Sequence, residues 1–250
     1  SGDPGVVRLD PSWFQASLSF IHMGFDHILH GTDHLLFLLC LVIPFRRFRG
    51  LIPVVTAFTV AHSMTLIASA YNLAPDALWF PPLIEVLIAA SIVYMALENI
   101  VKPGGARHRW MIAFGFGLVH GFGFSFALRQ TLQFAGSHLL TSLLSFNIGV
   151  ELGQLLALLI AIPLLDLLFR FVVAERMGTI ILSAFVAHTG WHWMLERWAA
   201  LAQYRFYAPA WDGLFWAAVL RWAALILGGA GLMWWIARRR VGTVREEAKS

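Results

Sequence analysis

Residues 26–43 read DHILHGTDHLLFLLCLVI, so a cluster of ionisable side chains leads directly into an apolar run. The cluster consists of Asp26, His27, His30, Asp33 and His34. Its two Asp-His pairs repeat at an interval of seven residues, which is two turns of a helix, so in a helical segment the three histidines share one face. Ionisable side chains are costly and rare inside a membrane, and a cluster beside an apolar run therefore predicts a functional site.

The composition of the chain is that of a membrane protein. Of its 250 residues, 59% are hydrophobic and only 13% are charged, whereas soluble domains carry about 25% charged residues. The net charge of +4 does not indicate nucleic-acid binding, because the basic residues fall at the ends of apolar runs and at the C-terminus. We therefore expect an all-α, polytopic helical bundle in contact with membrane lipid.

Apolar runs predict seven spanning helices and one further helix at the N-terminus. The predicted spans cover about 31–45, 51–71, 79–100, 109–134, 139–169, 177–196 and 211–237. The stretch 12–30 is expected to be a helix that lies in the membrane interface or packs into the bundle. The stretch 139–169 exceeds the roughly 20 residues needed to span. We expect it to be tilted, or broken near Gly149, Gly153 or Pro163.

The basic residues predict the orientation of the bundle. With seven spans, one side receives Arg46, Arg47, Arg49, Lys102, Arg107, Arg109, Arg170, Arg176, Arg238, Arg239, Arg240, Arg245 and Lys249. Because cytoplasmic loops carry the excess of Lys and Arg, the N-terminus is expected outside and the C-terminus inside a bacterial inner membrane. Residues 1–11 are interpreted as a processed or engineered segment, 12–240 as one transmembrane domain, and 241–250 as a cytoplasmic tail.

This topology places polar residues from several spans at similar depths in the outer half of the membrane. His188 and His192 have the i,i+4 spacing that presents two imidazoles on one helix face, as in many helical metal sites. His62 lies among hydroxyl residues that can orient its ring, and His120 lies in a glycine-rich span. Glu151 shares a helix face with polar neighbours and requires a cation or a shared proton. We predict that His34, His62, His188 and His192 share one metal.

The mixed set of imidazoles and carboxylates defines the class of metal. The candidate ligands are His27, Asp33, His34, His62, His120, Glu151, His188 and His192. Such a set suits zinc, nickel, cobalt, iron or copper(II), and it argues against calcium and magnesium, which favour oxygen ligands. If the protein is an enzyme, the candidate catalytic residues are Asp33, Ser63 and Glu151. No Gly-x-Ser-x-Gly motif indicates a serine hydrolase.

Several motifs resemble a known family. The pattern His27-x5-Asp33-His34 before an apolar helix resembles the signature of the HupE/UreJ family of hydrogenase and urease accessory membrane proteins. The segments Ala61–Leu66, His120–Phe124 and Phe146–Gln154 also look like the branch of that family carrying Gly-x-Asp-His-Leu-Leu-Phe-Leu. This resemblance implies nickel or cobalt uptake, metal-binding roles for His27, Asp33 and His34, and a partner in metalloenzyme maturation.

Two other classes of function stay open at this point. Three histidines holding zinc, with an aspartate to activate water, would make a membrane-embedded hydrolase of a lipid, acyl or peptide substrate. The seven spans with scattered His, Asp and Ser also resemble, in outline, the alkaline-ceramidase and adiponectin-receptor superfamily. The third class is an accessory or sensor protein that holds metal for a partner. A carrier requires a polar route from the site to the cytoplasmic side, whereas a hydrolase requires a cytoplasmic side that is sealed.

Overall fold

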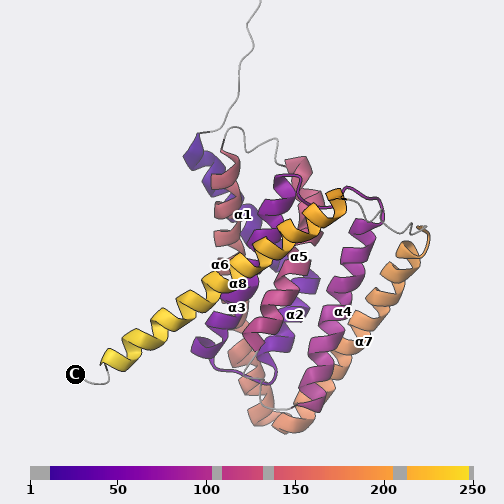
Figure 1. Cartoon of the computed structure of the whole chain (residues 1–250). Coiled ribbons are helices and arrows are strands. Elements are labelled where there is room, and N and C mark those ends of the chain that lie inside the picture. Colours follow the sequence, from indigo (N-terminus) through magenta and orange to yellow (C-terminus); the bar gives the residue numbers. More distant parts are fainter. Residues whose placement is uncertain (1–11, 103–108, 132–137, 205–212, 248–250) are drawn as a thin grey trace, which may run out of the picture. The chain divides into compact units, whose positions relative to one another are not determined.

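The computed structural model describes residues 12–102, 109–131, 138–204 and 213–247. In these residues every regular element is a helix, which confirms the all-α prediction. The helices are α1 (Trp13–His30), α2 (Thr32–Val42), α3 (Phe48–Ala70), α4 (Phe80–Val101), α5 (Arg109–Thr131), α6 (Leu139–Phe171), α7 (Glu175–Leu201) and α8 (Gly213–Glu247). The chain forms two compact units, residues 1–204 with α1–α7 and residues 205–250 with α8 (Figure 1).

Four of the described helices are long and apolar enough to cross a membrane. They are α3, α4, α6 and the segment Gly213–Gly231 of α8, and the bent pair α1–α2 makes a fifth if it counts as one span. α5 and α7 have similar lengths but carry more polar residues, including His120 and the pair His188 and His192. The structure therefore supports a polytopic membrane protein, and the count of seven spans stays a prediction.

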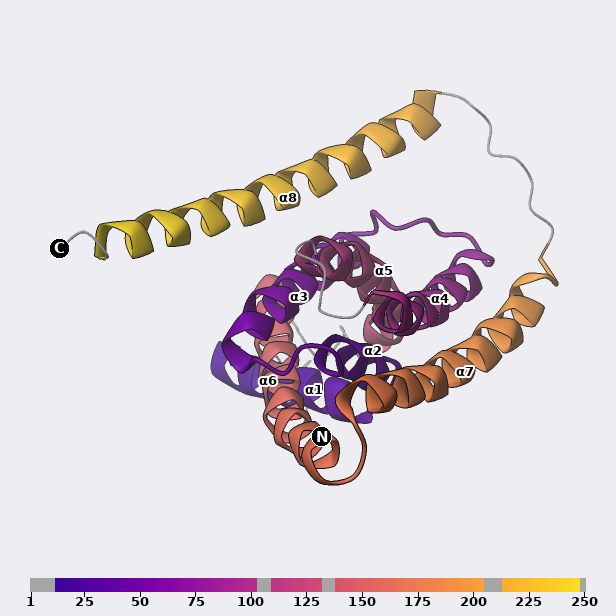
Figure 2. The ribbon, with the colours of Figure 1, turned by 90° about the horizontal axis from the view of Figure 1, so that it is seen from below.

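Three helix pairs make up most of the α1–α7 unit: α3 with α5, α1 with α6, and α4 with α7. α2 lies inside the ring that they form (Figure 2). Its buried residues Leu38, Cys40 and Leu41 join an apolar core that includes Val55 of α3 and Met95 of α4. The short α2 thus has neighbours all round, as expected of a helix that is apolar on every face.

The N-terminal helix packs into the bundle, as one of the two expectations for residues 12–30 proposed. Ser12 caps α1 through a capping box with Gln15, and the helix runs along α6. The expected break in α6 does not occur, since the helix is continuous over 33 residues. A Cβ atom added at Gly149 would overlap the carbonyl oxygen of Ile21 on α1. The glycine therefore allows close helix approach instead of a break.

Basic residues gather at one end of the α1–α7 unit, which we call the basic end. Arg46 lies in the connection from α2 to α3, and Arg176 begins α7; Figure 1 shows both connections at the same end. Arg46 donates to Asp166 of α6 at 2.6 Å and to Glu175 of α7 at 2.8 Å. Arg176 donates to the carbonyl oxygen of Ile100 at the end of α4. The predicted clustering of basic residues is thereby confirmed for these loops.

Two predicted boundaries bear on the ends of the chain. The predicted N-terminal segment 1–11 lies outside the described residues. The predicted tail begins at residue 241, within α8, which continues to Glu247. The helix therefore extends beyond the apolar segment that ends at Gly231.

Candidate metal centre

A sharp bend at Gly31 creates the centre of the site. α1 ends at His30, α2 begins at Thr32, and the two helices differ in direction by 69°. A Cβ atom at Gly31 would lie 2.5 Å from the carbonyl oxygen of His27 and 3.0 Å from Nδ1 of His34. Only glycine fits this close approach without displacing a neighbour. The bend therefore places a histidine from the last turn of α1 beside one from the first turn of α2.

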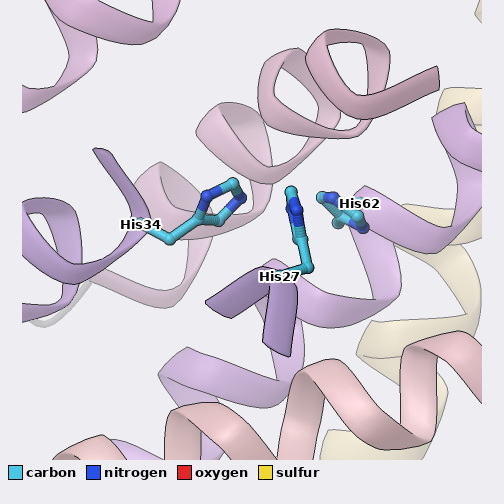
Figure 3. Close-up of side chains that lie close together, drawn as sticks. All are labelled: His27, His34 and His62. Carbon is cyan, nitrogen blue, oxygen red and sulfur yellow. The ribbon is translucent and has the colours of Figure 1, made fainter. Parts of the chain in front are cut away.

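Three imidazoles from three helices meet at this bend. His27 of α1, His34 of α2 and His62 of α3 reach toward one another (Figure 3), and one ligand atom from each lies within 4.8 Å of the other two. The ring centroids of His27 and His34 are 4.6 Å apart, and that of His62 is 6.1 and 6.0 Å from them. His34 and His62 are buried. Bond lengths of about 2 Å to each nitrogen would let one ion bind all three rings after small rotations.

Most ring nitrogens of these histidines have no hydrogen-bond partner in the described part of the chain. Both nitrogens of His34 and of His62, and Nε2 of His27, are buried without a hydrogen-bond partner. A buried polar group left unpaired costs about 1–3 kcal/mol, so several in one place require an explanation. Neutral imidazole nitrogens are good ligands for zinc, nickel and cobalt. The donor set therefore fits a divalent transition metal.

His120 of α5 adds a fourth imidazole next to the three. Its Nδ1 lies 2.9 Å from the carbonyl oxygen of Phe116. A carbonyl only accepts, so Nδ1 carries the proton and Nε2 keeps a free lone pair. That Nε2 is buried without a partner, and the ring centroids of His120 and His34 are 5.1 Å apart. His120 is thus oriented by a backbone carbonyl, as metal-ligating histidines commonly are.

Asp33 supplies a carboxylate at the edge of the group. Its Oδ1 lies 3.7 Å from Nδ1 of His34, which is within reach of electrostatic attraction but longer than a hydrogen bond. Asp26, the acid of the first Asp-His pair, instead lies 2.9 Å from Nδ1 of His22 on the exposed surface of α1. The two predicted acids therefore differ in position, and Asp33 alone joins the histidines.

A cavity of about 250 Å³ adjoins the histidines. It is lined by His27, Asp33, His34, Glu85, Ile88, His120, Gly123, Phe124 and Arg197. Aromatic rings form the walls around the imidazoles: the centroid of Phe124 is 4.0 Å from that of His27, and Phe58 lies 5.1 Å from His120. The site therefore combines polar donors with an apolar surround, as ligand sites commonly do.

Glycines hold α5 against α3 directly behind the site. A Cβ atom at Gly121 would overlap the carbonyl oxygen of His62 and Oγ1 of Thr65, and one at Gly117 would lie 2.9 Å from Cβ of Ala61. Small residues at these positions let the two helices approach closely enough to place His120 beside His34. The glycine-rich stretch around His120 thus serves close packing and site geometry together.

The remaining predicted residues lie elsewhere. Glu151 of α6 is half-buried and accepts a hydrogen bond from Thr56 at 2.7 Å, while Ser63 donates to the carbonyl oxygen of Thr59 at 2.6 Å. His188 and His192 lie together on α7, with ring centroids 4.4 Å apart, but both are exposed. None of these four lines the cavity. The structure therefore brings His34 and His62 together without the α7 pair.

Sequence reasoning missed two contributors to the cavity. From the sequence, no role was assigned to Arg197 or to the phenylalanines near the histidines. A signal for Arg197 exists, because it follows His192 on the same predicted helix close to the outer end. Its side chain direction, however, depends on how α7 packs against α4.

The comparison with family models identifies a match over most of the chain. No curated protein and no solved structure shows a detectable similarity to the chain. A family model described as HupE / UreJ protein matches residues 5–197, which is well over half of the chain and includes every residue that lines the cavity. The resemblance that the motifs suggested is thereby confirmed, and the chain belongs to the HupE/UreJ family.

Proposed function

We propose that the protein takes up a divalent transition-metal ion, nickel or cobalt, through the site formed by His27, His34 and His62. The observation that carries this proposal is the convergence of three imidazoles from three helices, with their buried ring nitrogens unpaired. Membership of the HupE/UreJ family supports the choice of metal, because the family is associated with nickel and cobalt accessory or transport functions. His120 and Asp33 complete the ligand set.

Polar residues between α3 and α6 support a route for the ion away from the site. Thr59 lies about one turn from His62 toward the basic end and donates to Gln154 at 2.9 Å. Thr56, about 9 Å along the helix from His62, donates to Glu151 at 2.7 Å. The second oxygen of Glu151 is buried without a hydrogen-bond partner in the described chain. A carboxylate with a free oxygen suits a second station for a cation.

The direction of transport follows from the proposed orientation. If the N-terminus lies outside and the basic end faces the cytoplasm of a bacterial inner membrane, the cavity opens to the outside. An ion that reaches the cytoplasm would then supply the maturation of a metalloenzyme, in keeping with the accessory role of the family. Neutral imidazoles would select the metal, and Asp33 and Glu151 would balance its charge.

Metal influx into vesicles tests this proposal. The protein is reconstituted into vesicles that contain a metal-sensitive dye, and nickel or cobalt is added outside. We expect influx with the wild type and none with His34→Ala or His62→Ala. Purified wild type should bind about one ion per chain, and each variant should lose it.

The exposed pair on α7 provides the matched control. The double variant His188→Ala/His192→Ala also removes two imidazoles, but from outside the cavity, so it should keep both bound metal and influx. Loss of the bound ion in this control, with retention in His34→Ala, would overturn the assignment of the site. A wild type that binds metal tightly but admits none would overturn uptake.

A zinc-dependent hydrolase is the second candidate, and one observation favours it. Between Thr56 and the basic end lies an apolar core that includes Leu51, Val55, Met95 and Leu158, all buried. A sealed core on that side suits an enzyme whose substrate reaches the cavity from the other side. A bound zinc ion would supply an activated water, and Asp33 is placed to take the proton. Zinc retained without influx of any divalent metal would support this candidate.

A further inference from the structure

The cavity beside the histidines contains a positive charge, although a metal ion is its proposed occupant. Arg197 of α7 lines the cavity together with Asp33 and Glu85. Its Nη1 donates to the backbone carbonyl of Glu85 at 3.3 Å, and its guanidinium lies 5.4 Å from the centroid of Trp193. Among the described residues no carboxylate lies within 4 Å of its nitrogens, so Arg197 forms no ion pair there.

The charges that line the cavity do not cancel once an ion is bound. Asp33 and Glu85 bring two negative charges, Arg197 brings one positive charge, and a divalent ion brings two more. The histidines are neutral when they bind a metal. The loaded cavity therefore carries one positive charge in excess. Glu85 is exposed and Arg197 is half-buried, so an anion from solution can reach this charge. A ligand with one negative charge would balance it.

The geometry leaves room for such a ligand. The three imidazoles, together with His120 and Asp33, occupy at most five positions, so an ion that takes about six ligands keeps one position open. The cavity volume of about 250 Å³ exceeds that of a few water molecules, which occupy about 30 Å³ each. A guanidinium has five N–H donors in a planar fork, and this fork matches a carboxylate or a phosphate. One donor of Arg197 is used on Glu85, and among the described residues the others have no recorded hydrogen-bond acceptor.

We propose that the cavity takes its metal together with a small oxyanion, a carboxylate or a phosphate group. One oxygen of this ligand occupies an open position on the ion, and Arg197 holds its negative charge. The inference rests on the proposed metal site and adds the chemical class of the co-ligand. It makes the transported species a metal complex instead of a bare hydrated ion.

Spectroscopy of the cobalt-loaded protein tests this inference. The full chain in detergent micelles is loaded with one equivalent of Co²⁺, and its visible absorption is followed while acetate or inorganic phosphate is added at constant ionic strength. We expect a saturable spectral change, since an oxyanion replaces water on the metal. Saturation by acetate assigns the ligand to the carboxylates, and saturation by phosphate assigns it to the phosphates.

Two arginines of α7 form the matched comparison. Arg197 and Arg176 both donate to backbone carbonyls of α4, but only Arg197 lines the cavity. Arg197→Gln should weaken the apparent affinity for the oxyanion at least tenfold while cobalt stays bound, and Arg197→Lys should retain part of it. Arg176→Gln should behave as the wild type.

Three results would contradict the inference. An oxyanion affinity that is equal in Arg197→Gln and wild type would overturn it, because the anion would then bind the metal alone. A cobalt spectrum that responds to neither anion would overturn it as well. A wild type that binds no cobalt would overturn the proposed metal site itself. If Arg197→Gln does not fold, Arg197→Lys gives the same comparison with the charge retained and the fork removed.

Discussion

At the basic end of the α1–α7 unit, the guanidinium of Arg46 meets the carboxylates of Asp166 and Glu175. Around Gly31, by contrast, His27, His34 and His62, with His120 beside them, have buried ring nitrogens without hydrogen-bond partners in the described chain. The first arrangement pairs Arg46 with two acceptors. The second concentrates donors and acceptors that the described chain leaves unused. Paired polar groups hold helices together, and unpaired ones in a cavity indicate a ligand. The comparison therefore distinguishes polar groups that stabilise helix packing from polar groups that are available to a ligand in the same bundle.

The largest expected effect comes from breaking the buried pairing at the basic end. Arg109 of α5 donates to Asn99 and to the carbonyl oxygen of Leu41, and it lies 3.5 Å from Glu98. Arg109→Met would remove the positive charge beside the Glu98 carboxylate and the donor to the Asn99 oxygen. We expect the free energy of unfolding to fall by about 3–5 kcal/mol, which lowers the midpoint of thermal unfolding in detergent. Arg47→Met, at an exposed position nearby, should unfold as the wild type does.

The next effect concerns the close contact behind the site. Gly121→Ala would force α5 away from α3, because the new methyl group overlaps the carbonyl oxygen of His62. Overpacking of this kind costs about 1–3 kcal/mol, and the displacement should lower cobalt affinity as well as stability. Gly115→Ala is the control, since no atom lies within 4 Å of its new methyl group. Equal cobalt affinities in the two variants would show that the contact does not position His62.

Replacing an unpaired histidine should have a smaller effect of the opposite sign on stability. His62→Leu removes a fully buried imidazole whose nitrogens lack partners, so the metal-free protein should become more stable by about 1 kcal/mol. The same variant should lose the bound ion. Thermal unfolding of metal-free samples checks the first result, and metal analysis checks the second. A destabilised metal-free variant would place His62 among the structural polar groups instead.

The smallest effect is expected at Arg46. Partial burial lowers the pKa of Arg46, but hydrogen bonds to Glu175 and Asp166 outweigh it and raise the pKa above the usual value, so this side chain stays charged. Both acids are more than half exposed, so Arg46→Met should lower the free energy of unfolding by about 1 kcal/mol or less. The difference between the unfolding midpoints of Arg46→Met and wild type in detergent measures it.

Hydropathy and residue rarity predicted most of the fold and part of the site. Apolar runs predicted most helix ends to within a few residues, because a helix must satisfy its backbone polar groups inside the membrane. The exception is α8, which continues to Glu247, beyond the predicted end at residue 237. His27, His34 and His62 stood out since ionisable residues are rare in apolar helices. The boundary predicted between the N-terminal helix and the first span, at residues 30–31, agrees with the structure, but the bend of 69° between the two helices was not predicted. An interval of seven residues also fits a continuous helix, so the spacing identified two candidate ligands without the bend that brings them together.

The role of α7 shows where sequence reasoning stops. An i,i+4 spacing shows that His188 and His192 share a face of their helix, but it does not say which way that face points. That direction depends on how α7 packs against α4, which no pattern within α7 encodes. The same packing turns Arg197 into the cavity. On α7, therefore, Arg197 lines the cavity, whereas His188 and His192, which spacing and depth had suggested as ligands, do not.

Because of the bend at Gly31, the affinity of the proposed site for a metal ion depends on the angle between α1 and α2. His27 and His34 belong to different rods that meet at one glycine, so a rotation of either rod changes the separation of their nitrogens. An ion bound to both rings would hold α1 and α2 at one angle. By reciprocity, any force that alters this angle changes the affinity for the ion by the same free energy. Since α1 lies along α6, a shift of α6 would lower the affinity for the ion without contacting any of the residues that bind it.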